Sequence, residues 1–335
     1  MAEQSVEELV ARLRPGYRLG RVGRVVDDTS EFMAIGQGDV LRLAGRHYLV
    51  FKDAMERRFG YVDAKFWVKK CLELETGERR IVKLVFHESF PLRVGDVSVL
   101  CFRSPAKEAR VLETVRGDGR FMQGFAAQDA AGNLVRIIEM VSGANIENVV
   151  AAIGLEHADY FRAVFPRLLA GFIQACQAIA WLHSRGERHG DVGRDHLFIE
   201  HKTGGMRWID FDYAYETHEN PYGMDLAGLG DILVFLAGKG VHTIQGMRES
   251  GTPKPLLDTL VPDDFSLVFG NRLVNLGKIF PRVPDSLNRI LLHFAAGAEV
   301  FYESVNELLD DLEPVASAMG AGAGIKNEAG GKPLF

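Results

Sequence analysis

The hydrophobic and polar positions follow different patterns in the two halves of the chain. From Tyr17 to Val141, short apolar runs such as 48–51, 65–74 and 80–86 are separated by turn residues, which is typical of β-strands. The segment 75–78, Glu-Thr-Gly-Glu, predicts a hairpin turn between the second and third of these runs. The pattern therefore predicts a sheet in the first half of the chain.

One helix is expected within this first half, at 105–115. Ser104 directly precedes it and is a suitable N-cap, because its hydroxyl can accept a hydrogen bond from an unpaired backbone N–H of the first turn. Gly117 follows it and provides a stop signal. The first half is thus expected to be a sheet plus one helix.

Beyond residue 146 the pattern changes to helical periodicity. The segment 165–184 places six apolar side chains on one face, and Gly186 ends it. That face consists of Leu168, Leu169, Phe172, Ile173, Cys176 and Ile179. Further helices are expected at 224–237, 284–293 and 300–312.

Composition and charge narrow the classes of function. The formal net charge of −6 over 335 residues argues against a nucleic-acid partner, which would call for a basic face. Cys71, Cys101 and Cys176 lie far apart in apolar surroundings, so we expect reduced core residues. The N-terminus lacks the features of a signal peptide, and no apolar run approaches the roughly 20 residues of a membrane helix. The expectation is a cytoplasmic protein without a membrane partner.

Lys83 is the single charge in the apolar run 81–86. A buried ammonium needs an acid, and the helix 105–115 offers Glu108 and Glu113. The alternative is that Lys83 points into solvent from an edge strand.

The loop 189–196, His-Gly-Asp-Val-Gly-Arg-Asp-His, is dense in His and Asp. It is either capable of chemistry or simply a solvated polar loop.

Two carboxylates, Asp210 and Asp212, stand two residues apart in the expected strand 207–212. On an extended strand they would share one face, where like charges raise a pKa unless a cation lies between them. A hard cation such as Mg²⁺ would satisfy both carboxylates; the alternative is a surface strand whose carboxylates face water.

In this order, these motifs resemble the protein kinase-like superfamily. The resemblance implies that Lys83 holds the α- and β-phosphates of ATP and that Glu108 pairs with it. The segment 137–143 is similar to the hinge between kinase lobes, with Ile138 as gatekeeper and backbone groups of Glu139 and Val141 binding adenine. The segment 178–191 resembles the helix and catalytic loop, so Asp191 takes the place of the catalytic aspartate.

The resemblance assigns further roles in the second half. Asp210 would be the principal Mg²⁺ ligand, and Asp225 would brace the catalytic loop. His196 stands where kinases carry a metal-binding Asn, and its imidazole suits Mn²⁺ or Zn²⁺ better than Mg²⁺. Asp212 replaces a Gly and would donate an oxygen. Gly193 stands where a lysine is common, and Arg194 beside it would supply the positive charge.

The sequence also departs from the kinase pattern in the segments that would bind the phosphates and the acceptor. No glycine-rich loop precedes Lys83, the nearest candidate being 57–60. The short segment between Asp210 and Asp225 resembles choline kinases and aminoglycoside phosphotransferases, and it lacks the shelf that presents a peptide in protein kinases.

The fold expected from the resemblance is α+β and two-lobed, with an antiparallel sheet plus one helix followed by a mostly α-helical lobe. An N-terminal extension of unknown role and partly β structure is expected at 1–46. The kinase-like N-lobe is expected at 47–141, the C-lobe at 142–316 and a disordered tail at 317–335.

Three functions are carried forward. The first is a divergent Ser/Thr protein kinase using ATP and Mg²⁺ or Mn²⁺, with Asp191 as catalytic base and a small-molecule acceptor as its variant. The second is a pseudokinase that binds nucleotide or a partner without transfer. The third is a two-metal hydrolase. Its centre would be built from His189, Asp191, Asp195, His196, Asp210 and Asp212.

Overall fold

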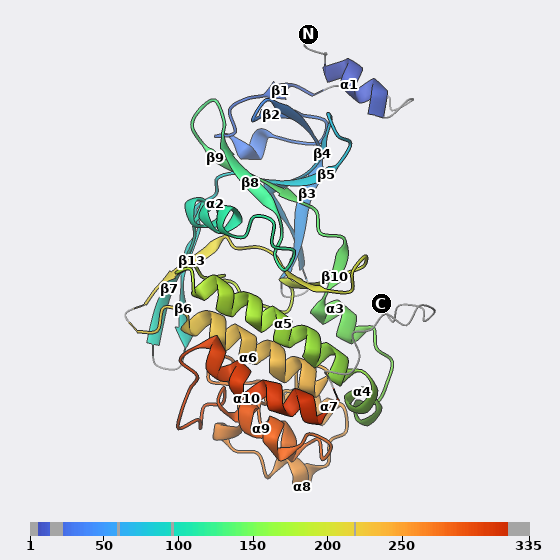
Figure 1. Cartoon of the computed structure of the whole chain (residues 1–335), viewed down its shortest axis with the longest axis vertical. Coiled ribbons are helices and arrows are strands. Elements are labelled where there is room, and N and C mark those ends of the chain that lie inside the picture. Colours follow the sequence, from blue (N-terminus) through green and yellow to red (C-terminus); the bar gives the residue numbers. More distant parts are fainter. Residues whose placement is uncertain (1–5, 14–22, 59–60, 95–96, 218, 321–335) are drawn as a thin grey trace. The chain divides into compact units, whose positions relative to one another are not determined.

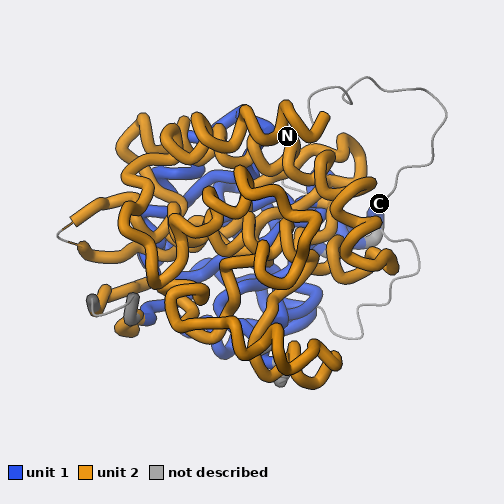
Figure 2. Tube along the Cα trace, turned by 90° about the horizontal axis from the view of Figure 1, so that it is seen from below, with its two compact units in different colours: residues 1–88, 103–141 blue, residues 89–102, 142–335 orange. Residues whose placement is uncertain are grey.

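The computed structural model describes residues 6–13, 23–58, 61–94, 97–217 and 219–320. By its internal contacts the chain divides into two compact units, coloured separately in Figure 2. Unit 1 comprises residues 1–88 and 103–141, and unit 2 comprises residues 89–102 and 142–335. The two units are described in turn.

Unit 1 is built around a curled, almost wholly antiparallel sheet (Figure 1). The strand order is β1-β2-β3-β4-β5-β9-β8, with β1 parallel to β2. The elements are α1 (Val6–Leu13), β1 (Val25–Val26), the 3-10 turn η1 (Phe32–Ala34), β2 (Val40–Leu43), β3 (Arg46–Arg58), β4 (Tyr61–Glu73), β5 (Arg79–Lys83), α2 (Pro105–Thr114), β8 (Gly124–Gln128) and β9 (Leu134–Glu139).

Local signals account for the turn and the helix that the sequence predicts here. Gly77, in the turn between β4 and β5, has a φ of +75°, a left-handed conformation that glycine adopts without strain. At the start of α2, the Ser104 hydroxyl accepts the Lys107 backbone N–H at 3.2 Å, and Pro105 occupies the first turn. Both the hairpin and the capped helix are confirmed.

Part of the N-terminal segment completes one face of the sheet. Ile35 and Leu41 pack with Val82 in a buried core, and Lys83, the next residue along the strand, points to the opposite face. Beyond β1, Thr29 donates from its backbone N–H and its hydroxyl to one oxygen of Asp129 in the β8–β9 turn, both at 2.7 Å. These bonds tie the β1 edge of the sheet to its β8 edge.

Unit 2 is mostly helical, with two small antiparallel sheets in the orders β10-β11-β12 and β13-β7-β6. Its elements are β6 (Ser89–Val94), β7 (Val97–Arg103, whose last residue belongs to unit 1), β10 (Gly143–Asn145), α3 (Ile146–Ala151), α4 (His157–Ala163), α5 (Phe165–His183), β11 (Leu197–Glu200), β12 (Met206–Trp208), β13 (Tyr213–Glu216), α6 (Gly223–Gly238), α7 (Ile244–Glu249), α8 (Lys254–Leu257), η2 (Pro262–Asp264), η3 (Leu276–Lys278), α9 (Asp285–Leu292) and α10 (Val305–Ala318). The expected α+β class, with strands in the first part and helices in the second, is confirmed.

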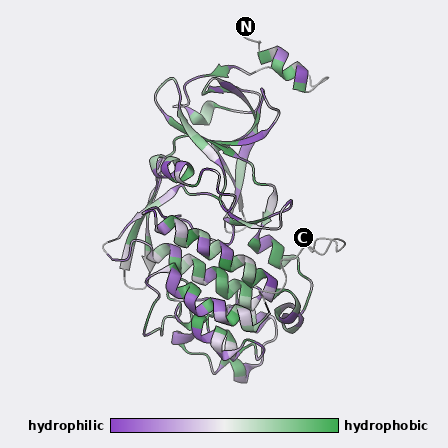
Figure 3. Cartoon of the chain, in the orientation of Figure 1, coloured by the Kyte–Doolittle hydropathy of each residue, from purple (hydrophilic) through white to green (hydrophobic). Residues whose placement is uncertain are grey.

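Helix α5 forms the centre of the unit 2 core. The apolar face predicted between Leu168 and Ile179 is buried, and α6 and α10 pack against the helix. Hydrophobic and hydrophilic residues alternate along the helices of this unit, as Figure 3 shows. Gly186 ends the α5 segment with a φ of +75°. The periodicity therefore located both the helix and its buried face.

The hairpin β6–β7 was not predicted as part of the second unit. It is inserted between the strand of Lys83 and the helix of Glu108, yet β7 pairs with β13, which follows Asp212 in the chain. Val99, Cys101 and Tyr215 form a buried cluster at this pairing. The alternating pattern predicts such strands but not which distant strand they join.

Helix α10 begins later than the predicted residue 300. Ser304 accepts the Glu307 backbone N–H and starts the helix at Val305, because a capped start is more stable than an uncapped one upstream. The helix then continues to Ala318 and includes Pro314. Residues 321–335 of the expected disordered tail lie outside the described residues.

Across the described segments, no single helix is long and apolar enough to cross a membrane. Helices α4 and α5 meet the length and composition requirement only as a pair, and they are bent by 60° relative to each other.

Candidate functional site

In unit 1, three charged side chains from three elements meet in a buried cluster. Lys83 Nζ on β5 lies 2.7 Å from Glu108 Oε1 on α2, and Arg136 Nε on β9 lies 3.0 Å from Glu108 Oε2. The Glu108 side chain is 0% exposed, and those of Lys83 and Arg136 are 6% and 3% exposed. A buried carboxylate between two cations gives each of the three charges a partner.

This cluster decides between the two acids that the sequence offered to Lys83. Glu113 lies on the exposed side of α2 and pairs with Arg116, so Glu108 is the partner of Lys83. Arg136 was missed by the sequence analysis. It is the one charge inside the apolar stretch of β9, the same signal that singled out Lys83, and it stands directly opposite Lys83 in the β5–β9 pairing.

The predicted hinge, 137–143, begins within β9 and includes the boundary between the units at Val141. Ile138 is 3% exposed and pairs with Ile81 of β5. The Glu139 backbone N–H donates to Gln123 O at 2.9 Å, and its carboxylate accepts the Gln123 N–H at 2.9 Å. Val141 is the last residue of unit 1 in this part of the chain. The Glu139 amide hydrogen is therefore already used in a bond within unit 1.

In unit 2, Asp225 of α6 holds the loop that carries Asp191. Its carboxylate accepts the backbone N–H groups of His189 and Gly190 at 2.7 and 2.8 Å and lies 3.0 Å from His183 Nε2. Gly228, one turn later, lets the loop approach, because a Cβ there would lie 2.3 Å from the Val192 carbonyl oxygen. Asp225 thus has the bracing role that the sequence suggested.

The His189 side chain is buried in the core of unit 2, although it belongs to the loop 189–196. Its ring is 0% exposed and lies edge-on to Trp208 and Phe211, with centroids 5.2 and 5.0 Å away. Its Nδ1 accepts the Asp191 backbone N–H at 3.2 Å. One of the two ring nitrogens that could ligate a metal is therefore already used by the loop backbone.

Asp210 departs from the extended strand that the sequence predicted. Strand β12 ends at Trp208, and Asp210 has a φ of +68°, in the left-handed region that non-glycine residues seldom adopt. The inference that Asp210 and Asp212 share one face of a strand is therefore wrong. Asp212 is 3% exposed, and the Phe211 side chain between them is fully buried.

Three carboxylates of the loop region surround His196. Its Nδ1 lies 3.4 Å from Asp191 Oδ2, and its Nε2 lies 3.7 Å from Asp195 Oδ2 and 3.8 Å from Asp210 Oδ2. Burial lowers the pKa of His196, but the attraction of Asp191, Asp210 and Asp195 outweighs it and raises the pKa to about 9. In this arrangement the imidazole is protonated at neutral pH and acts as a counter-ion to the acids.

The same surroundings set the proton affinity of Asp191. Loss of hydration raises the pKa of its carboxyl, His196 opposes this, and repulsion from Asp210 and Asp212 adds to it, giving a pKa of about 6. A group with such a pKa is ionised at neutral pH and still able to take up a proton. This is the chemistry expected of a general base.

Metal ligation is supported by the donor chemistry, although the side chains are not arranged as a formed site. Among the described residues, no group of three or more His, Cys, Asp or Glu side chains has metal-binding geometry. Asp210 and Asp212 offer hard oxygen atoms that suit Mg²⁺ or Mn²⁺. His196 does not suit a metal while protonated, since a nitrogen ligand must give up its proton.

Arg194 is engaged within unit 2. Its Nε lies 3.3 Å from Asp231 Oδ2, its NH1 group lies 3.8 Å from Glu147 Oε1, and its guanidinium lies 4.8 Å from the Phe235 ring centroid. The structure therefore places Arg194 between the loop and α6. Asp231 was not singled out by the sequence, because one acid on a helix carries no distinctive signal.

Comparisons with known proteins give limited further information. A search of solved structures matches Rad53 residues 1–466 in complex with AMP-PNP, at a TM-score of 0.44 and 15% sequence identity. The match covers 73% of this chain and 60% of that chain. No protein-family model and no curated protein sequence matches the chain.

Proposed function

We propose that the chain is a kinase-like phosphotransferase that transfers the γ-phosphoryl group of ATP to a hydroxyl, with a protein Ser or Thr as the first candidate acceptor. The observation that carries the proposal is the acid pair Asp191 and Asp210. Asp191 has a pKa suited to proton transfer, and Asp210 is held beside the same histidine in a strained conformation, which proteins retain mainly at functional sites.

Each residue has a defined role in the proposed reaction. Asp191 accepts the proton of the acceptor hydroxyl as its oxygen bonds to the γ-phosphorus and the bond from phosphorus to the β–γ bridging oxygen breaks, which releases ADP. Lys83 neutralises the α- and β-phosphates and is itself oriented by Glu108. Ile138, Glu139 and Val141 would contact adenine.

Asp210, with Asp212, would hold Mg²⁺ or Mn²⁺, and His196 would join them after losing its proton. When bound, the metal would neutralise charge on the phosphates. Arg194 would keep the loop in place through Asp231 and contribute positive charge near Asp191. Catalysis of this type depends mostly on positioning and charge neutralisation.

The proposal is tested by replacing Asp191 with Asn. Loss of the base should lower ADP release and autophosphorylation by about 10²- to 10⁴-fold. Stabilisation of the protein by ATP with Mg²⁺ or Mn²⁺, followed as a thermal shift, should persist. Asp195→Asn is the matched control, since Asp195 lies in the same loop and its side chain is 62% exposed. Full turnover in Asp191→Asn would refute the assignment.

A pseudokinase is the second candidate, and the position of the His196 ring among three carboxylates is the observation that favours it. A cation among Asp191, Asp195 and Asp210 already balances the acids that a metal would otherwise bridge. On this alternative, ATP stabilises the protein but neither Mg²⁺ nor Mn²⁺ supports ADP release. The thermal shift with ATP and the rate of ADP release, both measured on the unmodified chain, therefore separate the two candidates. If the chain turns over ATP with small hydroxyl compounds but no protein, the acceptor is a small molecule.

A further inference from the structure

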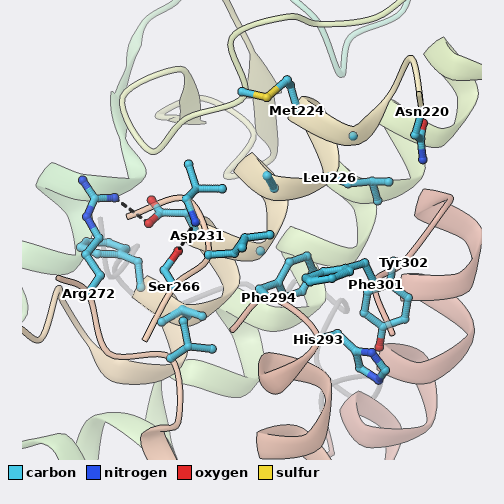
Figure 4. Close-up of a pocket in the computed structure, with 18 of the residues that line it drawn as sticks. Asn220, Met224, Leu226, Asp231, Ser266, Arg272, His293, Phe294, Phe301 and Tyr302 are labelled. Atoms are coloured by element: carbon cyan, nitrogen blue, oxygen red, sulfur yellow. Dashed lines mark hydrogen bonds and ion pairs between the residues drawn. The ribbon is translucent and has the colours of Figure 1, made fainter. Parts of the chain in front are cut away.

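A cavity in unit 2 lies along helix α6 and is used by none of the roles described above. It has a volume of about 580 Å³ and is bounded by α6, by residues around 266–274 and by residues around 293–303 (Figure 4). Small-molecule sites in proteins span about 300–1,000 Å³. The cavity is therefore of a size to hold one small organic molecule.

The walls of this cavity are mainly apolar and aromatic. Figure 4 shows Leu226, Phe294, Phe301 and Tyr302 around the space. Phe301 remains 44% exposed, and Val300 and Val241, which also line the cavity, are 65% and 42% exposed. Large apolar side chains that stay exposed around a hollow favour a ligand with an apolar body, because binding would remove them from water.

The charged groups of the lining are predominantly acidic. The carboxylates are Glu219, Asp231, Glu299 and Glu303, whereas Arg272 is the sole Lys or Arg of the lining among the described residues. Arg272 is already bound to Asp231, at 2.6 Å, and Asp231 also faces Arg194. The one interior acid is therefore neutralised by protein cations.

The three remaining carboxylates of the lining, unlike Asp231, lie at the exposed mouth of the cavity. Glu219, Glu299 and Glu303 are exposed and form no ion pair with a residue in the part of the chain that the structure describes. His242 adds no positive charge, because burial lowers the pKa of its ring, which lies 2.8 Å from the Gly238 carbonyl oxygen. The mouth of the cavity thus has a negative potential beside an apolar interior.

We propose that this cavity binds a small amphiphilic amine. Its apolar body fills the space between α6 and the Phe294–Phe301 segment, and its ammonium group faces Glu219, Glu299 and Glu303. Apolar burial supplies most of the affinity, and the acids select the charge of the ligand, since an exposed charge contact contributes little binding energy but rejects an anion. The wall of the site reaches the Asp191 loop through the contact of Asp231 with Arg194.

The proposal is tested with three probes that share one apolar body: biphenylbutylamine, biphenylbutanol and biphenylbutanoate. Isothermal titration calorimetry on the full chain should show the amine binding with a stoichiometry of one and about tenfold more tightly than the carboxylate, with the alcohol between them. Raising the salt from about 0.05 M to about 0.5 M should reduce this preference, because exposed charges are screened. The measurement requires no phosphoryl transfer, so its result is independent of the proposed enzymatic function.

Two variants locate the binding. Replacing Glu219, Glu299 and Glu303 together with Gln should abolish the preference for the amine while leaving the alcohol affinity unchanged; these exposed positions should not affect folding. Ala227→Leu, which fills the cavity from α6, should weaken all three probes. Three outcomes would overturn the proposal: no binding of any probe at millimolar concentration, equal binding of amine and carboxylate, or unchanged amine binding in the triple Gln variant.

Discussion

At the scale of single residues, Glu108 is the group on which the unit 1 cluster depends. Its carboxylate contacts both Lys83 and Arg136, and all three side chains are almost completely buried. Two cations at this depth are compatible only while the acid between them stays ionised, since an uncompensated buried charge is strongly unfavourable. The cluster therefore combines a structural role with the predicted phosphate contact of Lys83.

Glu108→Gln should destabilise unit 1 by about 3–5 kcal/mol, because it leaves two buried cations without their common carboxylate. Urea unfolding at neutral pH measures the change. Glu113→Gln, on the exposed side of the same helix, is the control and should alter stability by no more than about 0.5 kcal/mol. Equal effects of the two substitutions would show that the buried cluster does not support the fold.

At the scale of elements, the segment around β1 and η1 acts as a part of the sheet rather than as an extension. It covers the face opposite to Lys83, and Thr29 and Asp129 join the two edges. The sequence assigned no role to residues 1–46, because residues 24–43 contain only two very short strands, β1 and β2. These strands pair with each other, and β2 joins the sheet through β3.

The hydrogen bonds between Thr29 and Asp129 should make the free energy of unfolding depend on pH. Burial alone would raise the pKa of Asp129, but hydrogen bonds from Asn133 and Thr29 outweigh it and lower the pKa to about 2, below the ordinary value of 3.8. The folded state therefore binds this proton less readily than the unfolded state. Its stabilising contribution is fully present above pH 4 and is lost as the pH falls toward 2.

Asp129→Asn tests this pH dependence. The variant should be less stable than the parent at pH 6, and the difference should shrink as the pH is lowered to about 2. Thermal unfolding of both proteins across this range provides the comparison. A difference that stays constant between pH 6 and pH 2 would mean that the Asp129 carboxylate does not tie the sheet edges together.

Helix α6 of unit 2 also connects segments that lie apart in the sequence. Helix α6 carries Asp225, which fixes the loop of Asp191, and Asp231, which faces Arg194. The amine site proposed above is lined by the same helix, from Gly223 to Phe235. One helix thus supports both the loop of Asp191 and the wall of the cavity.

At the scale of the whole molecule, the proposed function requires that residues of both units act on one nucleotide. Lys83 belongs to unit 1, and Asp191 and Asp210 belong to unit 2. If a single ATP uses both sets, removal of either set should weaken the stabilisation that ATP and metal provide. At a hundredfold excess over its dissociation constant, a ligand stabilises the folded state by about 2.7 kcal/mol.

Lys83→Met and Asp210→Asn should each reduce this ligand-dependent stabilisation, and the double variant should lose little more than either single one, because the two groups act on one ligand. Thermal shifts with ATP and Mg²⁺ or Mn²⁺ measure it. Lys254→Met, at an exposed position of α8, is the control. Fully additive losses, or no loss in either variant, would contradict a shared nucleotide.

Much of the local structure followed from the sequence. The β4–β5 turn, the Ser104 cap of α2 and the buried face of α5 depend on residues within a few positions of one another, so their patterns are written along the chain. Lys83 was recognised because a single charge in an apolar strand requires a partner. The same reasoning applied to β9 would have found Arg136.

Only the tertiary structure decided which distant groups meet. By the charge argument alone Glu108 and Glu113 were equally acceptable partners, and only the resemblance singled out Glu108. The pairing of β7 with β13 could not be read from alternation, and the left-handed backbone of Asp210 replaced an expected strand. The physical reason is that periodicity and capping arise from short-range interactions, whereas strand partners and buried ion pairs are selected by long-range packing. The sequence by itself determined the elements and the charged residues; their arrangement into two clusters and a cavity came from the fold.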